Sequence, residues 1–230
     1  SLVEIEMPKS VKQIEQHAFR DCRSLEVVAL PSGIKEVENA AFQACDKLTS
    51  VVIPEGVTRI GERAFYSCIA LSSVVIPEGV TTIEKSAFFD CVSLTDVTLP
   101  STITTIGDEA FRYCYHLDSI VIPNSVRTIG RSAFANDSNL SFLAIGSGVA
   151  EIQESTFENC NSLTSITIPE SITSIGLGAF RFCESLTSIT IPDGVTSIGS
   201  YAFYDCDNLT EVKFPSSVER IGVESFFDCD

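Results

Sequence analysis

The sequence repeats every 23 residues, and this period constrains the fold more than any other feature. Phenylalanine recurs at ten equally spaced positions, 19, 42, 65, 88, 111, 134, 157, 180, 203 and 226, and nine prolines and nine cysteines keep the same spacing. The chain therefore holds ten copies of one unit, L-x-x-I-x-I-P-x-x-V-x-x-I-x-x-x-A-F-x-x-C-x-x. One such unit cannot bury its own apolar side chains, whereas stacked units share a continuous core. The period predicts a solenoid.

Each unit divides into a strand, a turn and a third segment. Residues 48–53, LTSVVI, alternate closely enough to predict a strand of about five residues with one buried face. Pro54 ends this strand, and IPEG fits a type I turn. The apolar spacing in residues 64–71 predicts a short helix or 3-10 segment on the far side of the coil.

These parts predict an α/β repeat solenoid in which residues 1–230 form a single domain of ten units. Its strands would pair in parallel at about 4.8 Å. The helical sides are bulkier than the strands, so we expect a concave sheet on the inner side of an arc.

Units such as LTSVVIPEGVTRIGERAFYSC and LTSITIPDGVTSIGSYAFYDC resemble leucine-rich repeats of the BspA type, also called the Treponema pallidum type. The resemblance covers the whole chain. It implies a surface or secreted protein of a bacterium or protist, and several such proteins are adhesins for host matrix proteins or other cells. The resemblance carries no catalytic motif, so it assigns no active residue.

The charge of the chain narrows the classes of partner. With 31 acidic residues against 15 basic ones, the net charge is −16. Such a chain is a poor match for nucleic acid or for anionic lipid. Its apolar runs are too short to insert into a membrane.

The cysteine column and the two histidines offer little chemistry. Nine thiols in single file, without a local Cys-x-x-Cys or a histidine partner, do not predict zinc. Their parallel Cβ vectors disfavour disulfides, so each is interpreted as a small apolar core residue. His17 and His116 lie four repeats apart and are expected in solvated loops. We therefore expect no enzyme activity, no cofactor and no metal.

The exposed face of the sheet is the predicted binding surface, because side chains from many strands form one extended surface there. Two outward columns carry mostly small hydroxyls and short aliphatic groups, which suit a protein or glycan surface better than a small molecule. The candidate ligand-binding residues are Asp96, Ser119, Val121, Phe142, Ala144, Ser165, Thr167 and Thr190. A rival site is the set of aromatic residues near the column phenylalanines, although these are more simply explained as shielding for the core.

Residues 133–148, AFANDSNLSFLAIGSG, break the pattern, with Asp137 in the cysteine column and Gly146 in the proline column. An unpaired buried carboxylate is costly. We therefore expect residues 136–139 to open into a turn in which Asp137 faces water or accepts backbone N–H bonds. Gly146 and Gly148 should allow a local bend or a looser coil. Phe142 in the same stretch makes the sheet uneven there.

These observations predict a non-enzymatic protein-interaction module of a cell-surface or extracellular protein that binds through the concave sheet. An intracellular scaffold that assembles partner proteins is the alternative. Both ends lack a polar capping coil. We therefore expect part of a longer array, or end-to-end self-association.

Overall fold

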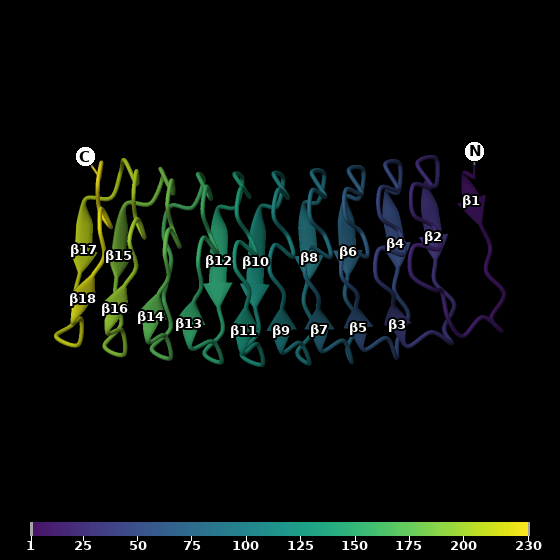
Figure 1. The fold of residues 1–230 in the computed structure, drawn as a ribbon, viewed down its shortest axis with the longest axis horizontal. Helices are drawn as coiled ribbons and strands as arrows, with labels where there is room; N and C mark the ends of the chain where they lie inside the picture. The colour runs from purple at the N-terminus through teal and green to yellow at the C-terminus, as the bar shows by residue number, and fades with distance from the viewer. Residues whose placement is uncertain (1, 230) are drawn as a thin grey trace.

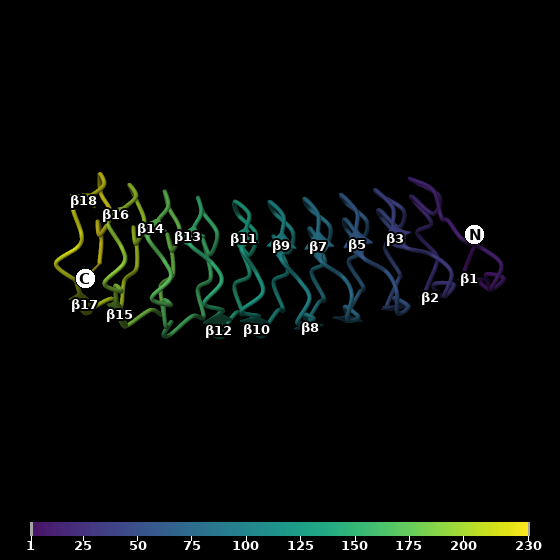
Figure 2. The same cartoon turned by 90° about the horizontal axis from the view of Figure 1, so that it is seen from below.

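The computed structural model describes residues 2–229, which wind into a row of stacked turns. The turns follow one another in sequence order, and the two ends of the chain lie at opposite ends of the row (Figures 1 and 2). All pairing between strands is parallel and joins positions one repeat apart, as at Ser73 and Asp96. The predicted solenoid is therefore confirmed.

The first side of each turn carries the longer strands, which together form the long-strand ladder. Its members are β1 (Glu4–Ile5), β2 (Val27–Ala29), β4 (Ser50–Val52), β6 (Ser73–Val75), β8 (Asp96–Thr98), β10 (Ser119–Ile122), β12 (Phe142–Ile145), β15 (Ser188–Thr190) and β17 (Glu211–Lys213). In the eighth repeat only isolated bridges form, from Ala144 to Thr167 and from Ser165 to Ser188.

A second side carries two-residue strands, the short-strand ladder, which the sequence analysis did not identify. Its members are β3 (Glu36–Val37), β5 (Arg59–Ile60), β7 (Thr82–Ile83), β9 (Thr105–Ile106), β11 (Thr128–Ile129), β13 (Glu151–Ile152), β14 (Ser174–Ile175), β16 (Ser197–Ile198) and β18 (Arg220–Ile221). The recurring Ile-Gly pair ends these strands where neighbouring backbones touch. A Cβ atom on Gly61 would lie 2.7 Å from the carbonyl oxygen of Val37.

The predicted helical segment is wrong, because residues 2–229 contain no helix of any type. The third side is instead a ladder of turns. In the second repeat the N–H groups of Ala40, Phe42 and Ala44 each donate to the next repeat at 2.8 Å, whereas the intervening N–H groups donate three residues back along the chain. Ala40 and Ala44 have φ angles of 50° and 56°, and the equivalent residues of every repeat are also left-handed. A left-handed residue cannot continue a right-handed helix.

The core lies between these three sides and is continuous along the row. Consecutive column phenylalanines stack, with ring centroids 5.1 to 5.7 Å apart from Phe19 to Phe226. The column cysteines are free thiols beside this stack. Each thiol from Cys45 onward donates to the carbonyl oxygen of the column phenylalanine in the preceding repeat, as between Cys68 and Phe42 at 3.2 Å. The apolar interpretation of the cysteines is thus correct but omitted this bond.

Candidate binding surface

The long strands place their outer side chains on one face, here called the strand face. In β6 the central residue, Val74, is buried, whereas Ser73 and Val75 on either side of it are exposed. The same alternation recurs along the ladder, because successive residues of a strand point to opposite faces. The strand face is therefore a continuous surface that crosses the repeats.

The structure brings all eight predicted residues together on this face. Ser119 pairs in register with Phe142, and Val121 with Ala144. Ala144 bridges to Thr167, and Ser165 to Ser188. Asp96, Val121, Phe142, Ser165, Thr167 and Thr190 are exposed, and Ser119 and Ala144 are half-buried.

One outer column of the strand face is apolar from the second to the seventh repeat except at Thr98, and it is polar beyond the seventh. Val52, Val75 and Val121 are 62%, 66% and 59% exposed, and Phe142 is 55% exposed. The column of Val121 continues as Ala144, Thr167, Thr190 and Lys213, whereas Phe142 pairs with Ser119 in the other outer column. Val52 and Val75 belong with the predicted residues. Their β-branched side chains at outward positions were the sequence signal for them.

Two shallow depressions lie along the apolar part. One of about 540 Å³ is lined by Val52, Val75 and Thr98 together with Pro77 and Pro100. A second of about 330 Å³ continues it past Thr98 to Val121. Among their described lining residues, Glu55, Glu78 and Asp96 are acidic and none is Lys or Arg. The surface combines an apolar floor with an acidic rim.

The irregular repeat does not open as predicted. Residues 136–140 keep the turn pattern of their neighbours, and Asp137 is 0% exposed. The expectation that it faces water is wrong, whereas the expectation of a backbone partner is correct. Its Oδ1 accepts the N–H of Cys114 at 2.8 Å, and its buried Oδ2 has no hydrogen-bond partner among the described residues. Burial raises the pKa of Asp137 well above its usual range.

The glycines of this repeat have a clear structural reason. A Cβ atom on Gly146 would lie 2.4 Å from the carbonyl oxygen of Pro123, so the backbone approaches too closely for a larger residue. The short-strand ladder is interrupted at this point, because β11 and β13 belong to different sheets within residues 2–229. The two short strands are therefore unpaired with each other here, while β10 and β12 remain paired over four residues. The expected local bend or looser coil stays a prediction.

The remaining candidate residues from the sequence lie apart from one another or pack as structural residues. His17 and His116 are both exposed and lie in different repeats. Residues 2–229 contain no group of three or more His, Cys, Asp or Glu side chains that could hold a metal ion. The aromatic residues on the turn side pack mainly on one another, as Tyr66 does on Phe89 at 4.7 Å. Most of them are half-buried, as expected for a shield over the core.

Comparisons with known proteins agree with this architecture. The sequence model of the BspA type leucine rich repeat region matches residues 1–118 and 104–230. The crystal structure of a leucine rich repeat protein from T. pallidum is similar, with 29% identity and a TM-score of 0.65 over 80% of this chain and 77% of that one. A leucine rich cell surface protein from Faecalibacterium prausnitzii has 26% identity and a TM-score of 0.52 over 98% and 85%. A search of curated proteins finds no match.

The sequence predicts no insertion into a membrane, and the structure addresses this prediction only for membrane-spanning helices. Nowhere between residues 2 and 229 is there a helix of the length and apolarity needed to cross a bilayer.

Proposed function

This chain belongs to the BspA-type leucine-rich repeat family, and on that premise we propose that it binds a protein partner through the strand face. Solenoids of this family generally serve as non-enzymatic protein-interaction modules. The finer proposal is adhesion or ligand binding at the cell surface or outside the cell, through the face that the sequence predicts to be concave.

The exposed apolar stripe is the observation that carries this proposal. Val52, Val75, Val121 and Phe142 are each more than half exposed, whereas the column phenylalanines from Phe42 to Phe203 are completely buried. Exposed apolar groups that gather on one face of a protein mark interaction sites, especially when polar residues surround them. Thr98 interrupts this stripe between Val75 and Val121. The aromatic ring of Phe142 is the type of side chain that anchors partners.

The acidic rim indicates which kind of partner surface is complementary to the strand face. Glu55, Glu78 and Asp96 border the apolar depressions, and the chain carries a net charge of −16. A partner surface with apolar groups flanked by Lys or Arg complements this arrangement, and opposite charges accelerate association. Glycans remain candidate ligands because the polar half of the strand face presents hydroxyls at Thr167 and Thr190.

The proposed location at the cell surface is based on the description of a similar protein. The F. prausnitzii protein is described as a cell surface protein. The second candidate, an intracellular scaffold, is favoured by the nine free cysteines, since thiols persist in reducing compartments. Labelling intact cells of the source organism with an antibody that cannot enter them distinguishes the two, because only a surface protein is stained.

A solid-phase binding screen against purified matrix proteins and glycans tests the proposal. The wild-type protein is compared with Phe142→Ala, Thr167→Lys and a matched control, Thr104→Lys, which lies beside the short strand β9. We expect binding to at least one surface, lost in the two strand-face variants and kept in the control. No binding at all, or equal binding by all four proteins, contradicts the proposal.

A further inference from the structure

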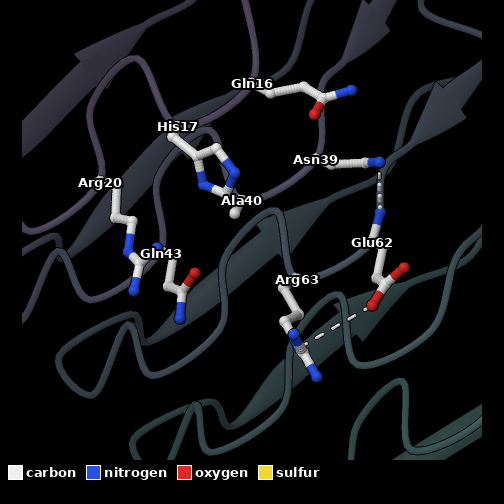
Figure 3. Close-up of a pocket in the computed structure, with 8 residues that line it drawn as sticks. All are labelled: Gln16, His17, Arg20, Asn39, Ala40, Gln43, Glu62 and Arg63. Carbon is white, nitrogen blue, oxygen red and sulfur yellow. Dashed lines mark hydrogen bonds and ion pairs between the residues drawn. The ribbon is translucent and has the colours of Figure 1, made fainter.

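A small polar hollow lies on the turn side of the first three repeats, away from the strand face. It has a volume of about 260 Å³. Its lining around Ala40 consists of Gln16, His17, Arg20, Asn39, Gln43, Glu62 and Arg63. Figure 3 shows these side chains arranged around the short side chain of Ala40. We call this hollow the Ala40 bay.

Ala40 forms the floor of the bay because its side chain is shorter than those of its neighbours in the same column. His17 and Arg63 occupy the equivalent position in the repeats before and after it. The three residues share left-handed φ angles of 62°, 50° and 55°, so their side chains leave the backbone in the same way. The N–H of His17 donates to the Asn39 carbonyl oxygen at 3.1 Å, and that of Ala40 to the Glu62 carbonyl oxygen at 2.8 Å. The floor is therefore preformed.

The walls of the bay supply hydrogen-bond donors and positive charge. Arg20 and Arg63 are each half exposed, and their nearest carboxylates are Asp21 at 3.5 Å and Glu62 at 3.9 Å. Exposed pairs at such distances contribute little and leave the guanidinium groups able to bind another acid. The amides of Gln16 and Gln43 add neutral donors and acceptors.

The charge distribution along the chain makes this end the place for an anion. Residues 1–63 contain 8 Lys or Arg and 10 Asp or Glu, whereas residues 64–230 contain 7 and 21. The field of the later repeats repels an acidic ligand, and that of the first three is nearly neutral. Within the lining of the bay, the two arginines outnumber the single carboxylate, Glu62, so the local charge is positive.

We propose that the Ala40 bay binds a small carboxylate-bearing group. A planar guanidinium donates two parallel hydrogen bonds to a carboxylate, which a spherical cation does not do. The hollow is smaller than the roughly 300 to 1,000 Å³ typical of sites for drug-sized ligands, so it takes a single acidic group at the end of a sugar or peptide. This site is independent of the strand face.

An NMR titration of the isotope-labelled full chain tests the site with four probes: glucuronate, neutral glucose, N-acetylalanine and inorganic phosphate. We expect saturable shifts of the Ala40 and Gln43 amides with the carboxylates but not with glucose. Saturation by glucuronate alone identifies a sugar acid, and saturation by both carboxylates identifies the acid group itself. In Arg63→Gln and Arg20→Gln the dissociation constant should rise about 10-fold or more.

The matched control is Arg131→Gln, which removes an arginine from the same side of the solenoid outside the bay, where it pairs with Glu154 at 3.6 Å. This variant should bind as the wild type does. The proposal is overturned if no carboxylate saturates or if glucose shifts the same amides. Tighter binding of phosphate than of both carboxylates, or an equal loss of affinity in Arg131→Gln and Arg63→Gln, also overturns it.

Discussion

Replacing Asp137 by cysteine should stabilise this protein, by an amount that grows with pH. The carboxyl group stands where other repeats place a thiol that donates to a phenylalanine carbonyl, as Cys160 does to Phe134. Its Oδ2 is buried without a partner among the described residues, and an unsatisfied buried polar atom costs about 1 to 3 kcal/mol. Asp137→Cys removes that cost and restores the thiol column.

The pH dependence follows from the raised pKa of Asp137, which burial causes. The folded protein retains the carboxyl proton at pH values where the unfolded chain has lost it. The stability that this proton contributes is complete below the ordinary pKa of 3.8 and is lost as pH rises through the folded pKa. Over that window the wild type loses about 1.4 kcal/mol per pH unit relative to a variant without the carboxyl group.

Urea unfolding followed by circular dichroism at pH 4.5, 5.5, 6.5 and 7.5, with a reducing agent present, measures this difference. Asp137→Asn should show the same pH trend as Asp137→Cys. Asp193→Asn, which removes an exposed carboxylate, is the matched surface variant. A constant difference between wild type and Asp137→Cys across this range, or a less stable Asp137→Cys at every pH, refutes the reasoning.

Three further predictions concern the packing of neighbouring repeats against one another. Gly146→Pro restores the column proline but should destabilise by about 1 to 3 kcal/mol, because the added atoms meet the Pro123 carbonyl; a higher urea midpoint would contradict this. Phe111→Ala opens the stack between Phe88 and Phe134 and should lower the free energy of unfolding by about 3 to 5 kcal/mol in the same assay. Phe142→Ala, at an exposed position, should lower it by less than about 0.5 kcal/mol. Equal losses would exclude a stacked core. Alkylation at pH 8 with mass spectrometry should label half-buried Cys22 and Cys229 before the seven buried thiols, because the reagent must reach the sulfur atom; uniform labelling of the folded protein would be inconsistent with the structure.

The repeat period was enough to predict the solenoid, the parallel pairing and the buried columns. These features depend on side chains that recur at fixed intervals, such as Phe65 and Cys68. Every further copy in the same column again indicates a buried position. The positions of the candidate strand-face residues followed from the alternation of the strands. The sequence also showed that Asp137 was out of place, but not how the protein accommodates it.

The turn ladder could not be derived from apolar spacing. Ala64, Phe65 and Cys68 have helical spacing, yet their backbone conformation depends on hydrogen bonds to the next repeat, which are not local. One local signal was present. The residue two positions after the column phenylalanine is Asp or Asn in six of ten repeats, as at Asp90 and Asn159. These residue types tolerate the left-handed conformation found there, at φ angles of 60° and 59°.

Asp137 is buried because the contacts between the surrounding repeats stabilise this coil by more than the burial of one carboxyl group costs. Phe134 stacks on Phe111 and Phe157, and the N–H of Asn136 donates to the Glu158 carbonyl oxygen at 2.7 Å. Opening this coil would break those contacts on both sides, which a single-residue argument from the sequence does not include.

The most direct test of the proposed function is a binding titration with the partner that the screen identifies. The double variant Val75→Lys/Val121→Lys places two charges on the apolar stripe, and Thr104→Lys/Thr173→Lys places two on the side of the short strands, where both threonines are exposed. We predict that the first variant weakens binding about 100-fold, because central apolar anchors carry most of the energy of an interface. The second should bind as the wild type does. Unchanged binding by Val75→Lys/Val121→Lys, in a protein that remains folded, would contradict the strand face as the binding surface.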